Sequence, residues 1–293
     1  MPHYLMTAEI PTLASALSWA KKVLQLSQPN DADATIDSKA LLSHCLQKPA
    51  VYLHTWPERT LSKQQWQAYQ QLIEQRKQGV PVAHLTGERG FWSLSLQVSP
   101  KTLIPRADTE VLVEKALSLF YDSPLDVLDL GTGTGAIALA LASERPHWQL
   151  TATDFDADIV ELARVNARRN NIANVHIMQS DWFAQLEGHH FSLIVSNPPY
   201  VEPDSPFLEQ GDVRFEPLSA LVAEQQGMAA LEHIIAHAGK YLLDAGWLVL
   251  EHGFQQAQQV RDALLLHGFT EVGSERDYAG LERITFGKWL KKK

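Results

Sequence analysis

The sequence predicts an α/β protein in which a helical bundle and a β-hairpin precede a mostly parallel, seven-stranded sheet. Three observations lead to this prediction. Residues 10 to about 80 carry apolar side chains at helical spacing. Residues 81–106 contain an apolar–polar alternation with a period of two. From about residue 107 to 293, short apolar runs alternate with helical segments, which is typical of a parallel sheet with helices on both faces.

The helical part, residues 1–80, is predicted to form a small bundle. The first helix repeats apolar residues at positions 13, 17, 20, 23 and 24, and the second covers 36–46. The third begins at Ser62, where Gln65 three residues later completes a capping-box pattern. The bundle is either a partner-recognition module or a stabilising cap.

The hairpin, residues 81–106, is expected to bury one face and to join the helices to the sheet. Trp92, Leu94, Leu96 and Val98 alternate with polar residues after a glycine turn. Arg106 closes this part, and a helix begins near residue 108. We expect Arg106 to form an ion pair at that helix start unless it faces the site.

The sheet domain, residues 107–293, is predicted from seven strand-like runs. Five of them precede or follow helices: 125–130, 149–153, 174–179, 191–196 and 247–251. Helices are expected at 136–142, 157–170, 227–243 and 255–267. The last two runs, 270–274 and 283–287, have no helix between them and are predicted to pair antiparallel at one edge.

A glycine-rich turn follows the first of these strands in the segment from Asp129 to Gly135. Glycines permit positive φ and a close approach of backbone to a ligand. Asp154, after the next strand, is placed to accept hydrogen bonds from ribose hydroxyls. Alone, the turn would match tight turns and other nucleotide folds equally well.

The segment Ser196-Asn-Pro-Pro-Tyr200 ends another strand. Two prolines fix φ and remove two N–H donors, so the segment is a rigid polar loop. Open α/β sheets bind ligands at the carboxyl ends of their strands. Asn-Pro is also a common surface turn. The glycine turn, Asp154 and this loop together favour a ligand site.

Asp181 and Trp182 follow the third strand and suit an adenine pocket. A carboxylate accepts from an exocyclic amine, and an indole stacks on a base. An aromatic residue at a strand end is more often part of the core, but its place at the carboxyl edge favours the ligand.

The choice of cofactor rests on the turn. Dinucleotide folds usually show Gly-x-Gly-x-x-Gly facing a pyrophosphate, whereas this turn is Gly-x-Gly-x-Gly after an acid. S-adenosylmethionine has no phosphate, and its ammonium and sulfonium favour nearby acidity. The predicted cofactor-binding residues are Asp129, Gly131, Thr132, Gly133, Thr134, Gly135, Asp154, Asp181, Trp182 and Asn197.

These motifs resemble those of the S-adenosylmethionine-dependent amino methyltransferases. Four further segments, 104–110, 180–182, 214–221 and 250–253, are similar to the protein-(glutamine-N5) methyltransferases of peptide chain release factors, the PrmC or HemK type. The resemblance covers nearly the whole chain. It implies a Rossmann-like class I methyltransferase sheet and an N-terminal substrate-recognition domain. Ala107 departs from the family, which commonly has a second proline there.

The resemblance implies the substrate: the glutamine of the Gly-Gly-Gln motif of class I release factors, in support of translation termination. An amide nitrogen is a poor nucleophile. In this interpretation the Asn197 side-chain oxygen and the Pro198 carbonyl accept its two N–H bonds and stabilise the growing positive charge. Pro199 stiffens the loop, and Tyr200 stacks on the amide. No general base is identified, and the proton is expected to go to water.

Composition excludes several classes of function. The net charge of −9 argues against broad binding to duplex nucleic acid. No apolar run reaches about 18 residues, and no signal peptide is recognised, so no membrane contact is expected. Cys45 is the only cysteine, which excludes an internal disulfide and suits the cytoplasm. No metal site is expected.

Three alternatives remain open. The same chemistry would methylate a glutamine of a ribosomal protein. An adenine-N6 methyltransferase would use the same loop, but it must extrude a base and hold phosphates. A cofactor-binding assembly factor would not need the intact loop.

Glu251 and His252 are expected only to end a strand. Substrate docking, domain motion and oligomeric state are left open.

Overall fold

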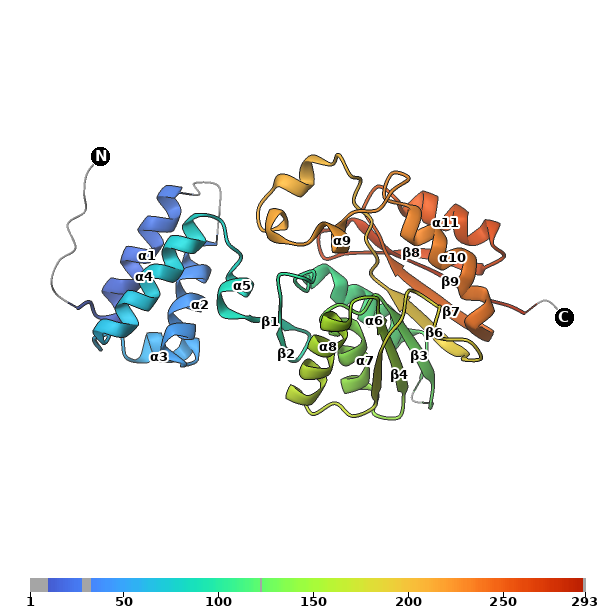
Figure 1. The fold of residues 1–293 in the computed structure, drawn as a ribbon, viewed down its shortest axis with the longest axis horizontal. Helices are drawn as coiled ribbons and strands as arrows, with labels where there is room; N and C mark the ends of the chain where they lie inside the picture. Colours follow the sequence, from blue (N-terminus) through green and yellow to red (C-terminus); the bar gives the residue numbers. More distant parts are fainter. Residues whose placement is uncertain (1–9, 28–32, 122, 292–293) are drawn as a thin grey trace. The chain divides into compact units, whose positions relative to one another are not determined.

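The computed structural model describes residues 10–291 apart from 28–32 and 122 (Figure 1). The chain divides into two compact units, one ending at Gly87 and one beginning at Glu88. Residues 1–9, where the sequence predicts no signal peptide, lie outside the described residues. Within the described ranges, no helix has both the length and the apolar character that crossing a membrane requires.

The first unit is helical, as predicted. Its elements are α1 (Leu13–Ser27), α2 (Ala34–Leu46), α3 (Ala50–Thr55), α4 (Lys63–Lys77) and α5 (Val82–Thr86). The predicted capping box is present, because Ser62 Oγ accepts from the Gln65 N–H at 3.1 Å and Gln65 Oε1 accepts from the Ser62 N–H at 2.8 Å. A buried Arg76–Asp37 ion pair of 2.6 Å joins α4 to α2. Helices α3 and α5 were not predicted, because six and five residues are too few to show a helical repeat.

The second unit begins with the predicted hairpin, β1 (Glu88–Phe91) and β2 (Leu94–Gln97), which pair antiparallel. Leu94 and Leu96 are buried as expected. Trp92 instead occupies the turn with φ of 55° and is half-buried. Asn166 of α8 (Ala157–Arg169) accepts from the Gln97 N–H at 2.7 Å and donates to the Gln97 carbonyl at 2.9 Å. These two hydrogen bonds connect the hairpin to α8.

The central sheet has the order β5-β4-β3-β6-β7-β9-β8. Its strands are β3 (Asp126–Leu130), β4 (Gln149–Asp154), β5 (Val175–Gln179), β6 (Phe191–Ser196), β7 (Leu242–Glu251), β8 (Thr270–Arg276) and β9 (Glu282–Lys288). Strands β3 to β7 are mutually parallel, and β9 runs antiparallel to both of its neighbours. The predicted antiparallel pair at the edge is therefore confirmed. Strand β7 begins five residues before the predicted start, because Leu242 already pairs with Phe191.

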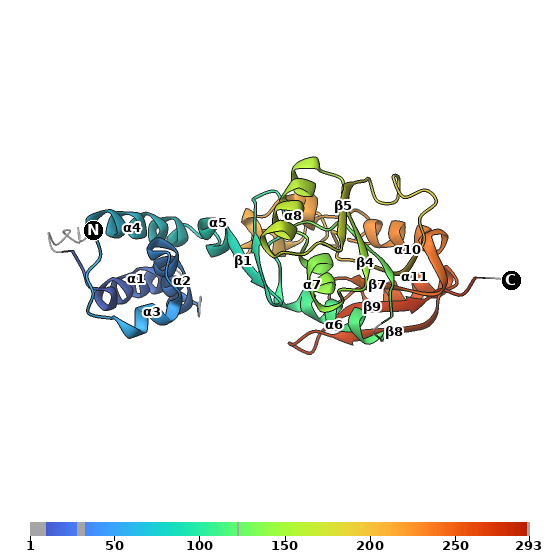
Figure 2. The ribbon, with the colours of Figure 1, turned by 90° about the horizontal axis from the view of Figure 1, so that it is seen from below.

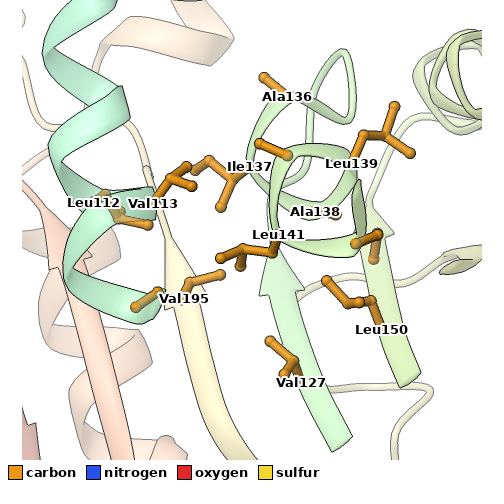
Figure 3. Close-up of a cluster of buried hydrophobic side chains, with 14 of the residues drawn as sticks. Leu112, Val113, Val127, Ala136, Ile137, Ala138, Leu139, Leu141, Leu150 and Val195 are labelled. Atoms are coloured by element: carbon orange, nitrogen blue, oxygen red, sulfur yellow. The ribbon is translucent and has the colours of Figure 1, made fainter. Parts of the chain in front are cut away.

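Helices cover both faces of the sheet (Figures 1 and 2). Helices α6 (Glu110–Ser118), α7 (Ala136–Glu144) and α8 pack on one face, and α10 (Ala229–Tyr241) and α11 (Ala257–Leu266) pack on the other. Strands β3, β6 and β7 contribute residues to the hydrophobic clusters on both faces. Val127 and Val195 join the first cluster, shown in Figure 3 with Leu112 and Ile137, whereas Leu128 joins the second. Burial on both faces is what a parallel sheet requires.

Four short helical turns complete the second unit: η1 (Ala107–Thr109), η2 (Pro206–Glu209), η3 (Val213–Phe215) and α9 (Leu218–Leu221). The last three belong to residues 201–223, which we call the strap. Because β3 to β7 are parallel, their carboxyl ends meet at one edge of the sheet, and the strap leaves β6 at that edge.

Candidate active site

The turn between β3 and α7 has a backbone that glycine alone adopts without strain. Gly131, Gly133 and Gly135 have φ values of 70°, 56° and 86°. A Cβ on Gly135 would also lie 3.0 Å from Leu139 Cδ1, inside the normal contact distance. The positive φ therefore favours glycine at position 135, and Leu139 leaves little room for a Cβ.

Asp129 lies beneath this turn and holds it. Its side chain is fully buried. Asp129 Oδ2 accepts from the Thr132 hydroxyl at 2.6 Å and from the Ala138 N–H at 3.2 Å. Burial raises the pKa of this carboxyl to about 7. The structure gives Asp129 a task in shaping the turn, and its predicted contact with a cofactor stays a prediction.

A first cavity of ≈ 170 Å³ opens above the turn, at the ends of β3, β4 and β5. The predicted cofactor residues that line it are Gly131, Thr132, Gly133, Thr134, Asp154, Asp181, Trp182 and Asn197. Asp129 and Gly135 do not line it. The segment 101–105, which follows the hairpin, supplies further wall residues that the sequence did not indicate.

Asp154 joins this cavity to the glycine turn. Asp154 Oδ2 accepts from the Gly133 N–H at 3.0 Å, and Oδ1 accepts from the Asp156 N–H at 3.3 Å. Burial raises the pKa of the Asp154 carboxyl. Trp182 has a positive φ of 46°, and its ring lies near Gly131, where a Cβ would come within 3.9 Å. The indole therefore reaches the turn from β5.

A second cavity of ≈ 900 Å³ lies on the other side of the loop that follows β6. Pro198, Tyr200 and nine residues of the strap line it. Leu103, Asn197 and Ala220 line both cavities, and Pro199 lines the first. The two cavities therefore meet at Asn197.

The carboxamide of Asn197 is oriented by Thr109. Asn197 Nδ2 donates to the Thr109 hydroxyl oxygen at 3.3 Å, which directs the side-chain oxygen elsewhere. Within the described part of the chain, no residue donates a hydrogen bond to Asn197 Oδ1 or to the Pro198 carbonyl. The loop thus holds two acceptors whose hydrogen-bonding capacity is unused.

Tyr200 is fixed at both ends. Its hydroxyl donates to Glu251 Oε1 at 3.1 Å, and its carbonyl accepts from Gln256 Nε2 at 3.1 Å. A Cβ on Gly227 would lie 2.1 Å from the Tyr200 carbonyl oxygen, so the chain at 227 packs directly against the loop. Burial raises the pKa of Tyr200.

Glu251 lines the second cavity, although the sequence indicated only that this residue ends a strand. It ends β7 beside β6, where Ser196 pairs with Leu250. Burial raises the pKa of the Glu251 carboxyl to about 7. His252, its neighbour, lines neither cavity; it is buried against Thr285 at 2.7 Å, and burial lowers its pKa to about 4. The sequence signal that could have indicated a place in the site for Glu251 is an acidic residue at the carboxyl end of a parallel strand.

Arg106 lines the second cavity, and its partner is distant in sequence. Arg106 Nη2 donates to both carboxylate oxygens of Glu216 at 2.7 Å. The Ile104 N–H also donates to Glu216 Oε1 at 3.3 Å. The expected ion pair at a helix start is replaced by a pair that ties the strap to the segment after the hairpin.

No group of three or more metal-ligating side chains occurs among the residues described.

Comparison with known proteins identifies the family. A release factor glutamine methyltransferase of Shewanella oneidensis is 50% identical over 283 residues, which cover 97% of this chain and 98% of the relative. The release factor glutamine methyltransferase of Escherichia coli K12 is 48% identical over 271 residues, 92% of this chain and 98% of the relative. This chain belongs to the release factor glutamine methyltransferase family.

Both compact units match domains of known families. The Methyltransferase small domain matches residues 108–209, and the PrmC N-terminal domain matches residues 15–87. A crystal structure of a methyltransferase from Pyrococcus furiosus superposes with a TM-score of 0.52 at 20% identity, over 76% of this chain and 98% of that one. The resemblance to release factor glutamine methyltransferases and the methyltransferase fold, both predicted from the sequence, are confirmed.

Proposed function

We propose that this protein transfers a methyl group from S-adenosylmethionine to the side-chain amide nitrogen, N5, of the glutamine in the Gly-Gly-Gln motif of class I peptide chain release factors. The modified release factor would then act in translation termination. The observation that carries the proposal is the pair of unused acceptors, Asn197 Oδ1 and the Pro198 carbonyl, at the meeting point of two cavities. Family membership over almost the whole chain supports the choice of substrate.

The first cavity suits S-adenosylmethionine. The Asp154 carboxylate has lone pairs left for ribose hydroxyls, and Asp181 and Trp182 offer an acceptor and a stacking surface for adenine. When bound, the cofactor supplies a methyl group on a positively charged sulfur. Asn197, which lines both cavities, would hold the substrate amide where that methyl group is presented.

The loop would act by position and electrostatics. Asn197 Oδ1 and the Pro198 carbonyl accept the two N–H bonds of the amide and aim its lone pair toward the first cavity. Both oxygens also stabilise positive charge that grows on nitrogen during transfer. Pro198 and Pro199 keep the loop rigid, and Thr109 fixes the carboxamide, so little reordering is needed. Tyr200 would stack on the planar amide.

The remaining predictions belong to the same proposal. Residues 1–80 form a substrate-recognition domain, 81–106 a hairpin linker and 107–293 the methyltransferase domain. The N-terminal unit has its own core, including Leu41, Tyr69 and Ile73, so it could present a preformed surface to the release factor. The release factor is the partner, with neither nucleic acid nor membrane involved, and the cytoplasm is the proposed location.

A methyl-transfer assay with labelled S-adenosylmethionine tests the proposal. Release factor, its Gly-Gly-Gln variant with glutamine changed to alanine, ribosomal protein and unmethylated DNA are offered side by side. We expect label on the release factor and none on the alanine variant. Label on ribosomal protein alone would keep the chemistry and replace the partner. Label on DNA alone would mean that the loop receives a flipped adenine.

A further inference from the structure

Trp182 reaches the first cavity from a turn whose backbone is held by its own neighbours. The residue has a left-handed φ of 46°, which is uncommon for a bulky side chain. The Ser180 hydroxyl donates to the Trp182 carbonyl at 2.8 Å and accepts from the Gln185 N–H at 3.1 Å. These two bonds fix the backbone after β5. They leave the direction of the indole to the groups that its ring contacts.

One of those groups is His233 of α10. The centroids of the Trp182 and His233 rings lie 5.9 Å apart, with the ring planes at 40°. Ring pairs at about 4.5–7 Å contribute more than the apolar area that they bury. Trp182 is half-buried, lines the first cavity and packs against the hydrophobic cluster to which α10 belongs. His233 does not line that cavity, so it meets the indole from outside it.

His233 belongs to a row of rings along α10. Residues 233, 237 and 241 are spaced by four, which places them on one face of the helix. The His233 and His237 rings are 4.4 Å apart. Phe183 lies 6.4 Å from the His237 ring and 4.6 Å from the Tyr241 ring. The row therefore connects α10 to both aromatic residues that follow β5.

The side chain of His233 has only ring contacts to offer. Within the described part of the chain it forms no hydrogen bond or ion pair. Partial burial and the charge of His237 lower the pKa of His233, and Asp181 opposes them. The imidazole is therefore mainly uncharged at neutral pH. Packing against Trp182 and His237 is the interaction that remains to it.

Building on the cofactor site proposed above, we propose that His233 is a positioning residue for cofactor binding, because it holds the Trp182 indole in the direction in which adenine stacks on it. A side chain that is fixed before its ligand arrives loses less conformational freedom on binding, which raises the affinity. This contribution belongs to binding and not to the chemical step. The Kd and KM of the cofactor should therefore depend on His233, whereas kcat should not.

The first test is calorimetric binding of S-adenosylhomocysteine to His233→Ala. Loss of one ring contact should raise Kd by about 2- to 10-fold. His233→Phe restores a ring and should bind within about twofold of the unaltered protein. His267→Ala is the matched control, because His267 is an exposed histidine at the end of α11 that lines neither cavity. Its removal should leave Kd unchanged.

A double-mutant cycle separates positioning from a general structural role. Trp182→Leu keeps an apolar side chain and removes the ring on which His233 acts. In that background, His233→Ala should have no further effect on Kd. At saturating S-adenosylmethionine and release factor, kcat for His233→Ala should stay within about twofold of the original, while KM for the cofactor rises as Kd does. A structural loss would instead lower kcat and weaken binding in both backgrounds.

The outcomes separate the inference from the proposed function. An unchanged Kd in His233→Ala, or an equal rise in Kd with and without the Trp182 ring, would overturn the inference. If His233→Ala does not fold, His233→Gln, a polar chain without a ring, takes its place in the cycle. If the unaltered protein binds S-adenosylhomocysteine but transfers no methyl group to release factor, the proposed substrate is wrong and the inference stands. If it does not bind S-adenosylhomocysteine, both are wrong.

Discussion

A single hydroxyl, that of Thr109, sets the orientation of the Asn197 carboxamide. An amide side chain has a donor end and an acceptor end, and a 180° flip would exchange them. Thr109 accepts from Asn197 Nδ2 at 3.3 Å, which leaves Oδ1 as the free end. A substrate amide offers two N–H donors, so only this orientation is complementary to it.

Removing the Thr109 hydroxyl should slow methyl transfer without abolishing it. Thr109→Val keeps the shape of the side chain and removes the acceptor for Asn197 Nδ2. A hydrogen bond contributes about 0.5–1.5 kcal/mol, so we expect kcat to fall by about 2- to 10-fold. Steady-state methyl transfer to release factor measures it. Thr109→Ser, which retains the hydroxyl, is the control and should stay near the original rate; equal losses in both variants would argue against the orienting role.

Among single residues, the sequence indicated those that belong to a short motif. The loop 197–200 and the glycine turn could be found because each is a continuous motif, and Asp154 because it follows the next strand after the turn. Thr109, Glu216 and Glu251 could not be assigned in this way. Thr109 lies 88 positions from Asn197, and Arg106 lies 110 positions from Glu216. Only the fold brings such pairs together.

The strap is the element that borders both cavities, and it has little regular structure of its own. Residues 201–223 contain only short helical turns. The strap closes on itself where the Val201 N–H donates to the Leu221 carbonyl at 2.8 Å and the Ala223 N–H donates to the Val201 carbonyl at 3.0 Å. Glu216, whose side chain is completely buried, connects the strap to Arg106.

We expect Glu216→Gln to loosen this anchor. The change removes the charge from a buried ion pair and leaves Arg106 without its carboxylate. Loss of one partner of a buried pair costs about 3–5 kcal/mol, and the one-third exposure of Arg106 should reduce this to about 1–3 kcal/mol. Urea unfolding measures the loss. Glu161→Gln breaks an exposed pair with Arg168 and should cost less than about 1 kcal/mol. Similar losses in both variants would contradict the anchoring role of Glu216.

Elements were predictable where a periodic pattern extends over enough residues. The strand at 191–196 and the helices around 63–77 and 157–169 lie where the sequence placed them. Strand β7 was placed too late, because Ala245, with φ of 60°, interrupts it and hides the pairing of Leu242. The strap has no repeat, so its course followed only from the structure.

At the scale of the whole molecule, the carboxyl ends of the five parallel strands lie beside the two cavities that the proposed reaction uses. Strands β3, β4 and β5 end at the first cavity, and β6 and β7 end at the second. The strand order places β6 between β3 and β7, so the acceptor loop stands between the two cavities. The alternation of strands and helices predicted a parallel sheet, but not which strands are adjacent, and adjacency is what makes Glu251 a neighbour of Asn197.

The proposed function requires Asn197 for methylation of the release factor glutamine. Mass spectrometry of release factor from cells that lack this protein, and from the same cells supplied with the unaltered protein or with Asn197→Ala, measures that requirement. We expect the Gly-Gly-Gln peptide to gain the mass of one methyl group with the unaltered protein alone. Full methylation with Asn197→Ala, or in cells without the protein, would overturn the proposed function.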